Sequence, residues 1–234
     1  MQPLVYSLID KAVYDYRLIE DGDSILVGAS GGKDSTLLVE YLANRLRRPS
    51  SRFSFTALNI QSDFAPPFPE GIKNLFSGWN VDFRKIDVDI LKRLKSGRRM
   101  NCFWCSMQRR TELLRFAMDN GFNKIALGHH KDDVLETALM NMIGKGELST
   151  MPAILRYGKY PVSIVRPLYY IDEKKIVAHA KDAGYFGWTC TCGYQENSGR
   201  KDMRRRLELL TDGDVNKKAR LFLSLRNINR EYLP

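Results

Sequence analysis

Two things are scarce in this chain: long apolar runs and cysteine. No apolar stretch approaches the roughly 18 residues that a membrane span requires. Residues 1–17 contain Asp10 and Asp15 and lack the profile of a signal peptide, so we expect a cytoplasmic protein without a membrane partner. The four cysteines form two close pairs, which in such a protein indicate metal or cluster ligands before structural disulfides.

Acidic residues are also scarce relative to basic ones. The chain has 27 Asp and Glu against 37 Lys and Arg, a formal charge of +10. The excess is concentrated in residues 92–115, with eight basic residues against Glu112, and in residues 199–234, with ten against five. Such clusters suit a polyphosphate partner, and RNA is the natural candidate. The alternative is a solvated basic face with no partner.

Internal repeats, low-complexity tracts and obvious linkers are absent, and 234 residues suit one α/β domain. Strand-like and helix-like segments alternate, which predicts a doubly wound parallel sheet. We expect five strands, at residues 24–29, 53–60, 81–86, 124–127 and 162–166. Expected helices cover residues 4–18, 35–46, 71–78, 89–95, 106–120, 172–183, 201–210 and 216–228. Residues 1–234 then form a single domain, with residues 199–234 as a basic helical tail.

The most informative segment is the glycine-rich turn Ser30-Gly31-Gly32-Lys33-Asp34-Ser35, between the first expected strand and the helix after it. Such a turn directs backbone N–H groups and the positive end of a helix dipole at an anion. Gly31 and Gly32 allow close approach, and Lys33 adds a point charge for phosphate. It is not a Walker A loop, which would need glycine at position 27 and Ser or Thr at position 34. The remaining alternative is a glycine-rich surface turn.

Two further loops follow expected strands, Asn59-Ile60-Gln61 and Gly128-His129-His130-Lys131-Asp132-Asp133. In a doubly wound sheet, ligands bind at the carboxyl ends of the strands where strand order reverses, so all three loops can face one crevice. Asp132 or Asp133 could cap a helix or hold a magnesium ion that bridges ATP phosphates, and Asp34 is another candidate ligand. Either histidine could equally serve packing or capping.

The cysteines, Cys102-x-x-Cys105 and Cys190-x-Cys192, could form a four-thiolate zinc site or hold an iron–sulfur cluster. The short second spacing suits a zinc ribbon poorly, and a disulfide or inert thiols remain alternatives. Between the first pair, Phe103 and Trp104 could shield a cluster, stack on a base or pack in the core. Nearby basic side chains could bind phosphate or face solvent: Arg109, Arg110, Arg204, Arg205 and Arg206.

Taken in order, these motifs resemble the tRNA 2-thiocytidine synthetase family of PP-loop ATP pyrophosphatases. The likeness runs from about Ile19 to about Leu210 and includes Met151-Pro152 and Cys192-Gly193-Tyr194-Gln195-Glu196-Asn197. It implies ATP, Mg²⁺ and a [4Fe–4S] cluster on three cysteines, with Cys102, Cys105 and Cys192 as ligands. The family usually has C-x-x-C where this chain has C-x-C, so Cys190 is displaced by one residue.

Applied to this sequence, the resemblance implies magnesium at Asp34 and Asp133. It implies RNA or phosphate contacts at Arg109, Arg110, Arg204 and Arg205. The implied ATP-binding residues are Ser30, Gly31, Gly32, Lys33, Asp34, Ser35, Asn59, Gly128, His129 and Asp133.

The reaction that the resemblance implies is adenylation of a cytidine in the tRNA anticodon loop, followed by replacement of its 2-oxygen with sulfur. The partners would be tRNA and a sulfur donor, as sulfide or persulfide derived from a cysteine desulfurase; monomer and homodimer are both left open. One alternative is the same chemistry on another tRNA base or on a small molecule. Another is a zinc-stabilised nucleotide- or RNA-binding protein without catalysis.

Overall fold

The computed structural model describes residues 2–94, 97, 100–187 and 199–232, so Cys190 and Cys192 lie outside the described residues. The chain divides into two compact units, which we call the sheet unit and the helical unit. The sheet unit comprises Met1–His130 and Pro152–Glu196, and the helical unit comprises Lys131–Met151 and Asn197–Pro234. Within the described ranges, every helix is too short or too polar to cross a membrane.

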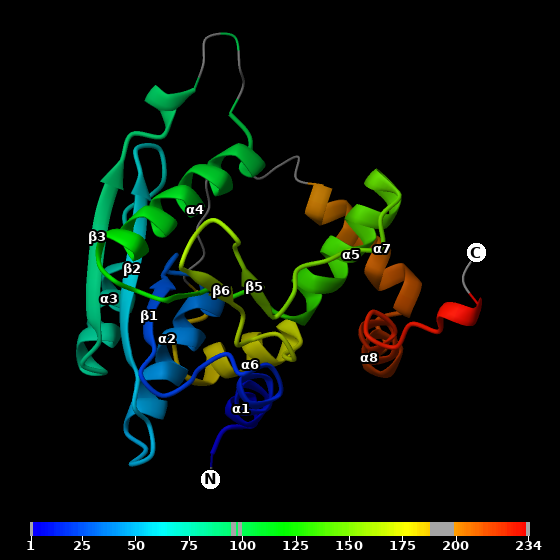
Figure 1. The fold of residues 1–234 in the computed structure, drawn as a ribbon, viewed down its shortest axis with the longest axis horizontal. Helices are drawn as coiled ribbons and strands as arrows, with labels where there is room; N and C mark the ends of the chain where they lie inside the picture. Colours follow the sequence, from blue (N-terminus) through cyan, green and yellow to red (C-terminus); the bar gives the residue numbers. More distant parts are fainter. Residues whose placement is uncertain (1, 95–96, 98–99, 188–198, 233–234) are drawn as a thin grey trace. The chain divides into compact units, whose positions relative to one another are not determined.

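The sheet unit is built on six strands in the order β3-β2-β1-β4-β6-β5 (Figure 1). Their bounds are β1 Ser24–Gly28, β2 Ser54–Ser62, β3 Asp82–Val88, β4 Lys124–Ala126, β5 Ile154–Arg156 and β6 Ser163–Val165. All neighbouring strands are parallel except β5, which runs antiparallel to β6. The predicted class of fold is confirmed. The prediction of five strands missed β5, whose three residues carry no apolar pattern of a buried strand.

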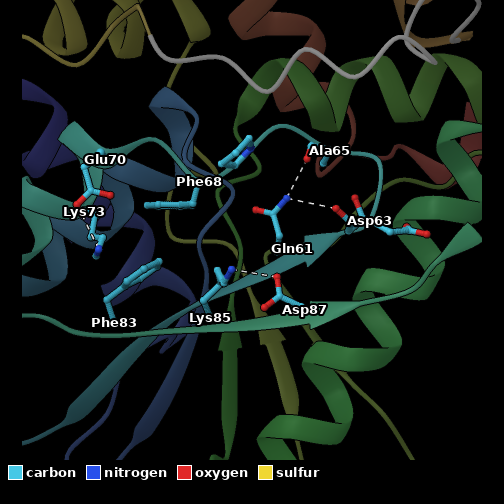
Figure 2. Close-up of a pocket in the computed structure, with 11 residues that line it drawn as sticks. Gln61, Asp63, Ala65, Phe68, Glu70, Lys73, Phe83, Lys85 and Asp87 are labelled. Atoms are coloured by element: carbon cyan, nitrogen blue, oxygen red, sulfur yellow. Dashed lines mark hydrogen bonds and ion pairs between the residues drawn. The ribbon is translucent and has the colours of Figure 1, made fainter.

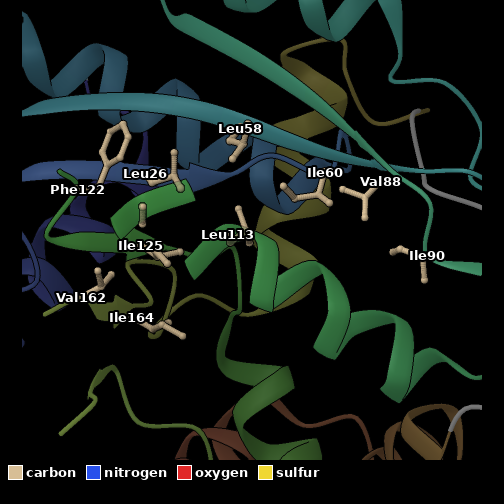
Figure 3. Close-up of a cluster of buried hydrophobic side chains, with 11 residues drawn as sticks. Leu26, Leu58, Ile60, Val88, Ile90, Leu113, Phe122, Ile125, Val162 and Ile164 are labelled. Carbon is tan, nitrogen blue, oxygen red and sulfur yellow. The ribbon is translucent and has the colours of Figure 1, made fainter. Parts of the chain in front are cut away.

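Helices pack on both faces of this sheet. Leu26, Leu58, Ile125 and Ile164 form the main core cluster together with Leu113 of α4 (Figure 3). Because side chains alternate along a strand, Ile25 and Val27 point to the opposite face, where α2 packs on β1 and β2. The helices of this unit are α1 Leu4–Tyr16, α2 Lys33–Leu46, α3 Glu70–Gly78, α4 Cys102–Asp119 and α6 Glu173–Asp182, with the 3₁₀ turn η1 at Leu91–Arg93.

The expected helices are present, with two differences. The segment expected as a helix over residues 89–95 is only the single turn η1, where the Asp63 carboxylate accepts hydrogen bonds from the backbone N–H groups of Ile90 and Leu91. The expected ranges 89–95 and 106–120 leave the cysteine pair between two helices, but α4 begins at Cys102, because the Asn101 side chain accepts a hydrogen bond from the Trp104 N–H and caps the helix there.

The helical unit contains α5 Lys131–Lys145, α7 Gly199–Thr211, α8 Val215–Ser224 and the 3₁₀ turn η2 Arg230–Tyr232. Helix α5 packs against both α7 and α8. The helices expected in the C-terminal tail are therefore present, and they share a unit with α5. That residues 1–234 form a single domain stays a prediction.

Strand β3 forms one edge of the sheet, and its outer side chains carry both signs of charge. Arg84 pairs with Asp82 at 3.1 Å, and Lys85 pairs with Asp87 at 3.0 Å. Beside this edge lies a hollow of about 680 Å³, in which Phe68 and Phe83 lie close together and Lys85 points at Asp87 (Figure 2). The hollow carries both signs of charge, and of the loops predicted to face the ligand only Asn59-Ile60-Gln61 reaches it, through Gln61.

Candidate nucleotide site

The strand order places a crevice between β1 and β4. In the sheet, β2 lies on one side of β1 and β4 lies on the other. The chain continues from β1 to β2 and from β4 toward β6, so the two connections run in opposite directions along the sheet. Ligands of doubly wound sheets bind at such a reversal, outside the carboxyl ends of the strands. The glycine-rich turn follows β1, and Gly128 and His129 follow β4.

The turn after β1 has the backbone of an anion cradle. Gly31 has φ +79°, a left-handed conformation, and a Cβ there would lie 2.8 Å from the Pro69 ring. Gly32 caps α2, so the helix begins at Lys33 and its first N–H groups lie beside the turn. The Ser35 hydroxyl donates to the Gly32 carbonyl at 3.0 Å and accepts from the Ser30 N–H at 3.2 Å. These bonds fix the turn without using a charged group.

Lys33 is held between two carboxylates. Its Nζ lies 2.9 Å from Glu173 Oε1 and 3.2 Å from Asp34 Oδ2, and all three side chains are partly buried. Burial alone would lower the pKa of Lys33, but the negative charge of Asp34 and the hydrogen bond to Glu173 outweigh it and raise the pKa. The ammonium is therefore charged across the physiological pH range.

The loop after β4 packs directly on the start of α2. A Cβ at Gly128 would lie 3.0 Å from the backbone of Asp34 and Ser35, so a larger residue would push the two segments apart. His130 is buried, and its Nε2 lies 3.9 Å from Asp34 Oδ1. Two of the three predicted loops thus meet in the sheet unit.

The third loop contributes through Asn59, which is buried at the end of β2. Its amide Nδ2 donates to the Ala29 carbonyl at 2.8 Å, the last carbonyl before the glycine-rich turn. Among the described residues, its Oδ1 has no hydrogen-bond partner. Asn59 therefore braces the turn, and its predicted contact with ATP stays a prediction.

A pocket of about 210 Å³ lies beside the turn. Its floor is apolar, with Leu58, Ile60, Leu113 and Leu127, and its rim carries Ser30, Ser106, Arg109, Arg110 and His129. Apolar pockets with a few convergent polar groups are typical ligand sites. Two of the four arginines predicted to bind phosphate thus line the pocket.

Cys102 and Cys105 lie in the first turn of α4, both partly buried. Trp104 and Cys105 pack against the core cluster, whereas the Phe103 side chain is 73% exposed. Two thiolates three residues apart on one helix turn can ligate the same metal or cluster. The described residues contain no group of three or more His, Cys, Asp and Glu side chains that could hold a metal ion, and the third predicted ligand, Cys192, lies outside them.

The remaining predicted residues lie in the helical unit. Asp132 is buried and pairs with Lys218 at 2.6 Å, and buried Glu136 pairs with Arg204 at 2.9 Å. Arg205 is mostly exposed and lies 3.3 Å from Asp202. Asp133 is buried in the first turn of α5. The phosphate role of Arg204 and the magnesium role of Asp133 stay predictions.

Glu173 is a residue of this site that none of the sequence motifs indicates. A weak signal was present, because Asp172-Glu173 follows the strand at residues 163–165 and begins a helix, where acidic residues are common. That signal indicates a helix start and does not identify Lys33 as a partner.

Comparison with known proteins agrees with this geometry. A family model described as a PP-loop domain matches residues 5–207, so the fold and the turn define a PP-loop domain protein. The tRNA-cytidine(32) 2-sulfurtransferase of Nitrosospira multiformis is 35% identical, over 97% of this chain and 77% of the relative. That of Methylobacillus flagellatus is 38% identical, over 97% and 76%. The chain belongs to the tRNA-cytidine(32) 2-sulfurtransferase family, so the predicted family and the prediction of an enzyme are confirmed.

Solved structures confirm the fold. The U34-tRNA thiolase NcsA from Methanococcus maripaludis, with its [4Fe-4S] cluster, superimposes with a TM-score of 0.78 at 19% identity, covering 96% of this chain and 80% of that one. The NH3-dependent NAD synthetase from Campylobacter jejuni has a TM-score of 0.52 at 14% identity, covering 97% and 96%.

Proposed function

We propose that this protein uses ATP to adenylate cytidine 32 of tRNA and then replaces the 2-oxygen of that base with sulfur. The observation that carries the proposal is the phosphate cradle of Gly31, Gly32 and Lys33 at the reversal of strand order, in a chain that belongs to the sulfurtransferase family. Sulfur would arrive as sulfide or persulfide from a cysteine desulfurase.

The residues present fit ATP. The N–H groups at the start of α2 and the Lys33 ammonium suit the phosphates, and only glycine fits at position 31. The apolar floor of the adjoining pocket suits the adenosine part, with Arg109 and Arg110 at its rim. Asp34 is the carboxylate of the sheet unit that we propose for Mg²⁺, which prefers oxygen ligands, and the magnesium role of Asp133 in the helical unit is a separate proposal.

In the first step, the 2-oxygen of the cytidine attacks the α-phosphorus of ATP and pyrophosphate leaves, giving an adenylated base. Lys33 and the helix N-terminus neutralise the charge that develops on the departing pyrophosphate. In the second step, sulfide attacks C2 and AMP leaves with the former 2-oxygen. Sulfur that arrives as a persulfide must first be reduced to sulfide by a thiol, which is oxidised to a disulfide. The protein's part is to position both reactants and to compensate negative charge.

The cysteine pair fits a [4Fe–4S] cluster by its donor chemistry, since Cys102 and Cys105 offer two thiolates on one turn at a helix N-terminus, where negative charge is stabilised. We propose Cys192 as the third ligand. When bound, the cluster would supply one iron that has no protein ligand, and this iron could carry the sulfur. Trp104 and Cys105 pack on the core cluster and so fix the turn that carries the ligands.

Exposed groups on α4 suit a tRNA surface. Phe103 and Met107 are exposed beside Arg110, and exposed aromatic rings stack on unpaired bases. Arg93 and Arg115 both pair with Glu112, at 2.6 and 3.0 Å, so this side of the helix keeps a positive excess. We propose that Arg110 and, in the helical unit, Arg205 contact phosphates of the tRNA.

The test is a reconstituted reaction with protein purified without oxygen. Iron and acid-labile sulfide are measured first, with an expected content of about four of each per chain for a [4Fe–4S] cluster. The protein is then incubated with tRNA, MgATP and sulfide, and 2-thiocytidine is quantified by mass spectrometry of the digested RNA. Formation of 2-thiocytidine only with ATP is the expected result.

Matched variants separate the roles of the cysteines. Cys192→Ala should abolish both the cluster and thiolation, whereas Cys190→Ala should spare them. The opposite pattern would reverse the two assignments. Zinc without iron would remove the proposed sulfur carrier, and absence of thiolated RNA from cluster-loaded enzyme would reject the proposed function.

A further inference from the structure

The ion pair between Lys33 and Glu173 joins parts of the chain that are 140 residues apart in sequence. Glu173 lies in the first turn of α6, and α6 packs on α2, the helix that begins at Lys33. The pair is not a solvated surface contact, because the side chains of Lys33 and Glu173 are 19% and 24% exposed. The packing of α6 therefore places a carboxylate at the phosphate cradle.

We propose that Glu173 is a positioning residue that competes with phosphate for the Lys33 ammonium. It thereby limits affinity for the triphosphate and speeds release of pyrophosphate. This inference rests on the proposed function, because it assumes that Lys33 binds ATP phosphates.

The charge balance supports competition. Lys33 carries one positive charge, and Asp34 and Glu173 carry two negative charges within 3.2 Å of it. A phosphate that binds Nζ must displace or share at least one of these carboxylates, and a partly buried carboxylate close to the incoming phosphate repels it. Asp34 adjoins Lys33 in the chain, whereas Glu173 is brought there by a separate helix.

Competition would also act after the chemical step. Tight binding of both triphosphate and pyrophosphate would not accelerate the reaction. Only interactions that are stronger in the transition state than in the bound substrate do so. When pyrophosphate leaves, the Glu173 carboxylate takes up the Lys33 hydrogen bond again and lowers the cost of separating the charges. Glu173 would thus exchange some affinity for faster turnover.

A purely structural role would have different consequences. An acidic residue in the first turn of a helix stabilises that helix through its dipole, and this contribution does not involve Lys33. The two roles are separated by asking whether the effect of Glu173 on nucleotide binding requires the Lys33 charge.

The experiment measures binding of MgATP and of inorganic pyrophosphate to the full-length protein by calorimetry, in a double-mutant cycle. Glu173→Gln keeps the size and removes the charge, so both ligands should bind about fivefold more tightly. Glu173→Asp keeps the charge and should return affinity toward wild type. Glu70→Gln is the matched control, because it removes an exposed carboxylate of the same unit, and it should change nothing.

The second arm repeats Glu173→Gln in a Lys33→Met background, with thermal unfolding of every variant to verify folding. There the change at Glu173 should tighten binding much less than it does with Lys33 present, because only the direct repulsion of phosphate by the carboxylate is removed. Unchanged or weaker binding by Glu173→Gln, or the same tightening without Lys33, would overturn the inference alone. Failure of wild-type protein to bind MgATP would overturn the proposed function as well.

Discussion

At the scale of single residues, Gly31 and Gly22 share a left-handed backbone but differ in their surroundings. Gly22 has φ +86° and no atom within 4 Å of a Cβ position, whereas a Cβ at Gly31 would meet Pro69. Gly22→Ala should therefore cost only the backbone strain, about 1 kcal/mol of unfolding free energy. Gly31→Ala adds the overlap and should cost about 3 kcal/mol. Chemical denaturation of both variants measures the difference.

Nucleotide binding gives a second comparison of these two glycines. Gly31→Ala should also weaken MgATP binding, because relief of the overlap moves the backbone N–H groups that face the phosphates. Gly22→Ala should bind MgATP as wild type does. Equal stability and equal affinity of the two variants would contradict the close contact at Pro69.

The residues of the glycine-rich turn and the cysteine pairs could be found in the sequence because each motif is contiguous. Glu173 could not, since its partner Lys33 is far away in the chain and only the packing of α6 on α2 brings them together. The same holds for the contact of Gly128 with the backbone at Asp34. Local chemistry is visible in the sequence, whereas partners across elements require the fold.

At the scale of elements, α4 has a buried face and an exposed face, and the neighbouring aromatic residues Phe103 and Trp104 lie on different faces. Trp104 packs against the core cluster, so Trp104→Ala should lower the unfolding free energy by about 2 kcal/mol. Phe103 is exposed, so Phe103→Ala should change stability by less than about 0.5 kcal/mol. Its effect should be weaker binding of tRNA, measured by filter binding. Wild-type tRNA affinity of Phe103→Ala would remove this ring from the proposed RNA surface.

Two adjacent lysines of α8 offer a similar contrast. Lys218 is buried against Asp132 of α5, so Lys218→Ala removes a buried cation from a buried carboxylate and should cost about 3 kcal/mol. Lys217 is exposed and pairs with Asp212, so Lys217→Ala should leave stability unchanged. Urea unfolding of both variants checks this, and equal midpoints would contradict the buried pair.

Elements with a strong apolar pattern could be predicted to within a few residues, as α2 and β1 show. Strand β5 was missed because it is short and lies at a sheet edge with little burial. The first turn of α4 was missed because the side chain that caps it, Asn101, sits between a basic stretch and the cysteines, where no apolar periodicity begins. A short edge strand and a capped helix start have a weak apolar pattern in the sequence, so neither is easily predicted from it.

At the scale of the whole molecule, the charge of +10 should make tRNA binding strongly dependent on salt. Each phosphate contact releases counterions, so about four contacts would weaken binding on the order of a hundredfold between 50 and 200 mM salt. Arg110→Ala should remove one phosphate contact and so reduce the slope of log Kd against log salt by about one. Titrations at several salt concentrations measure both, and a slope near zero would contradict an electrostatic RNA surface.

The class of fold could be predicted from the alternation of strands and helices, but the division into two units could not. Helix α5 begins with Lys131, Asp132 and Asp133, which in sequence suggest an exposed start. In the structure these side chains are buried, and Asp132 and Glu136 pair with residues of α8 and α7 that lie 86 and 68 positions away.

The open edge of β3 has a consequence for how this protein behaves at high concentration. An exposed edge strand offers backbone groups to which another chain can add, and this is a common route to aggregation. Here Asp82, Arg84, Lys85 and Asp87 form ion pairs along that edge, and a strand from a second molecule would have to strip water from them. These ion pairs along the edge strand thus protect the protein from forming intermolecular β-structure.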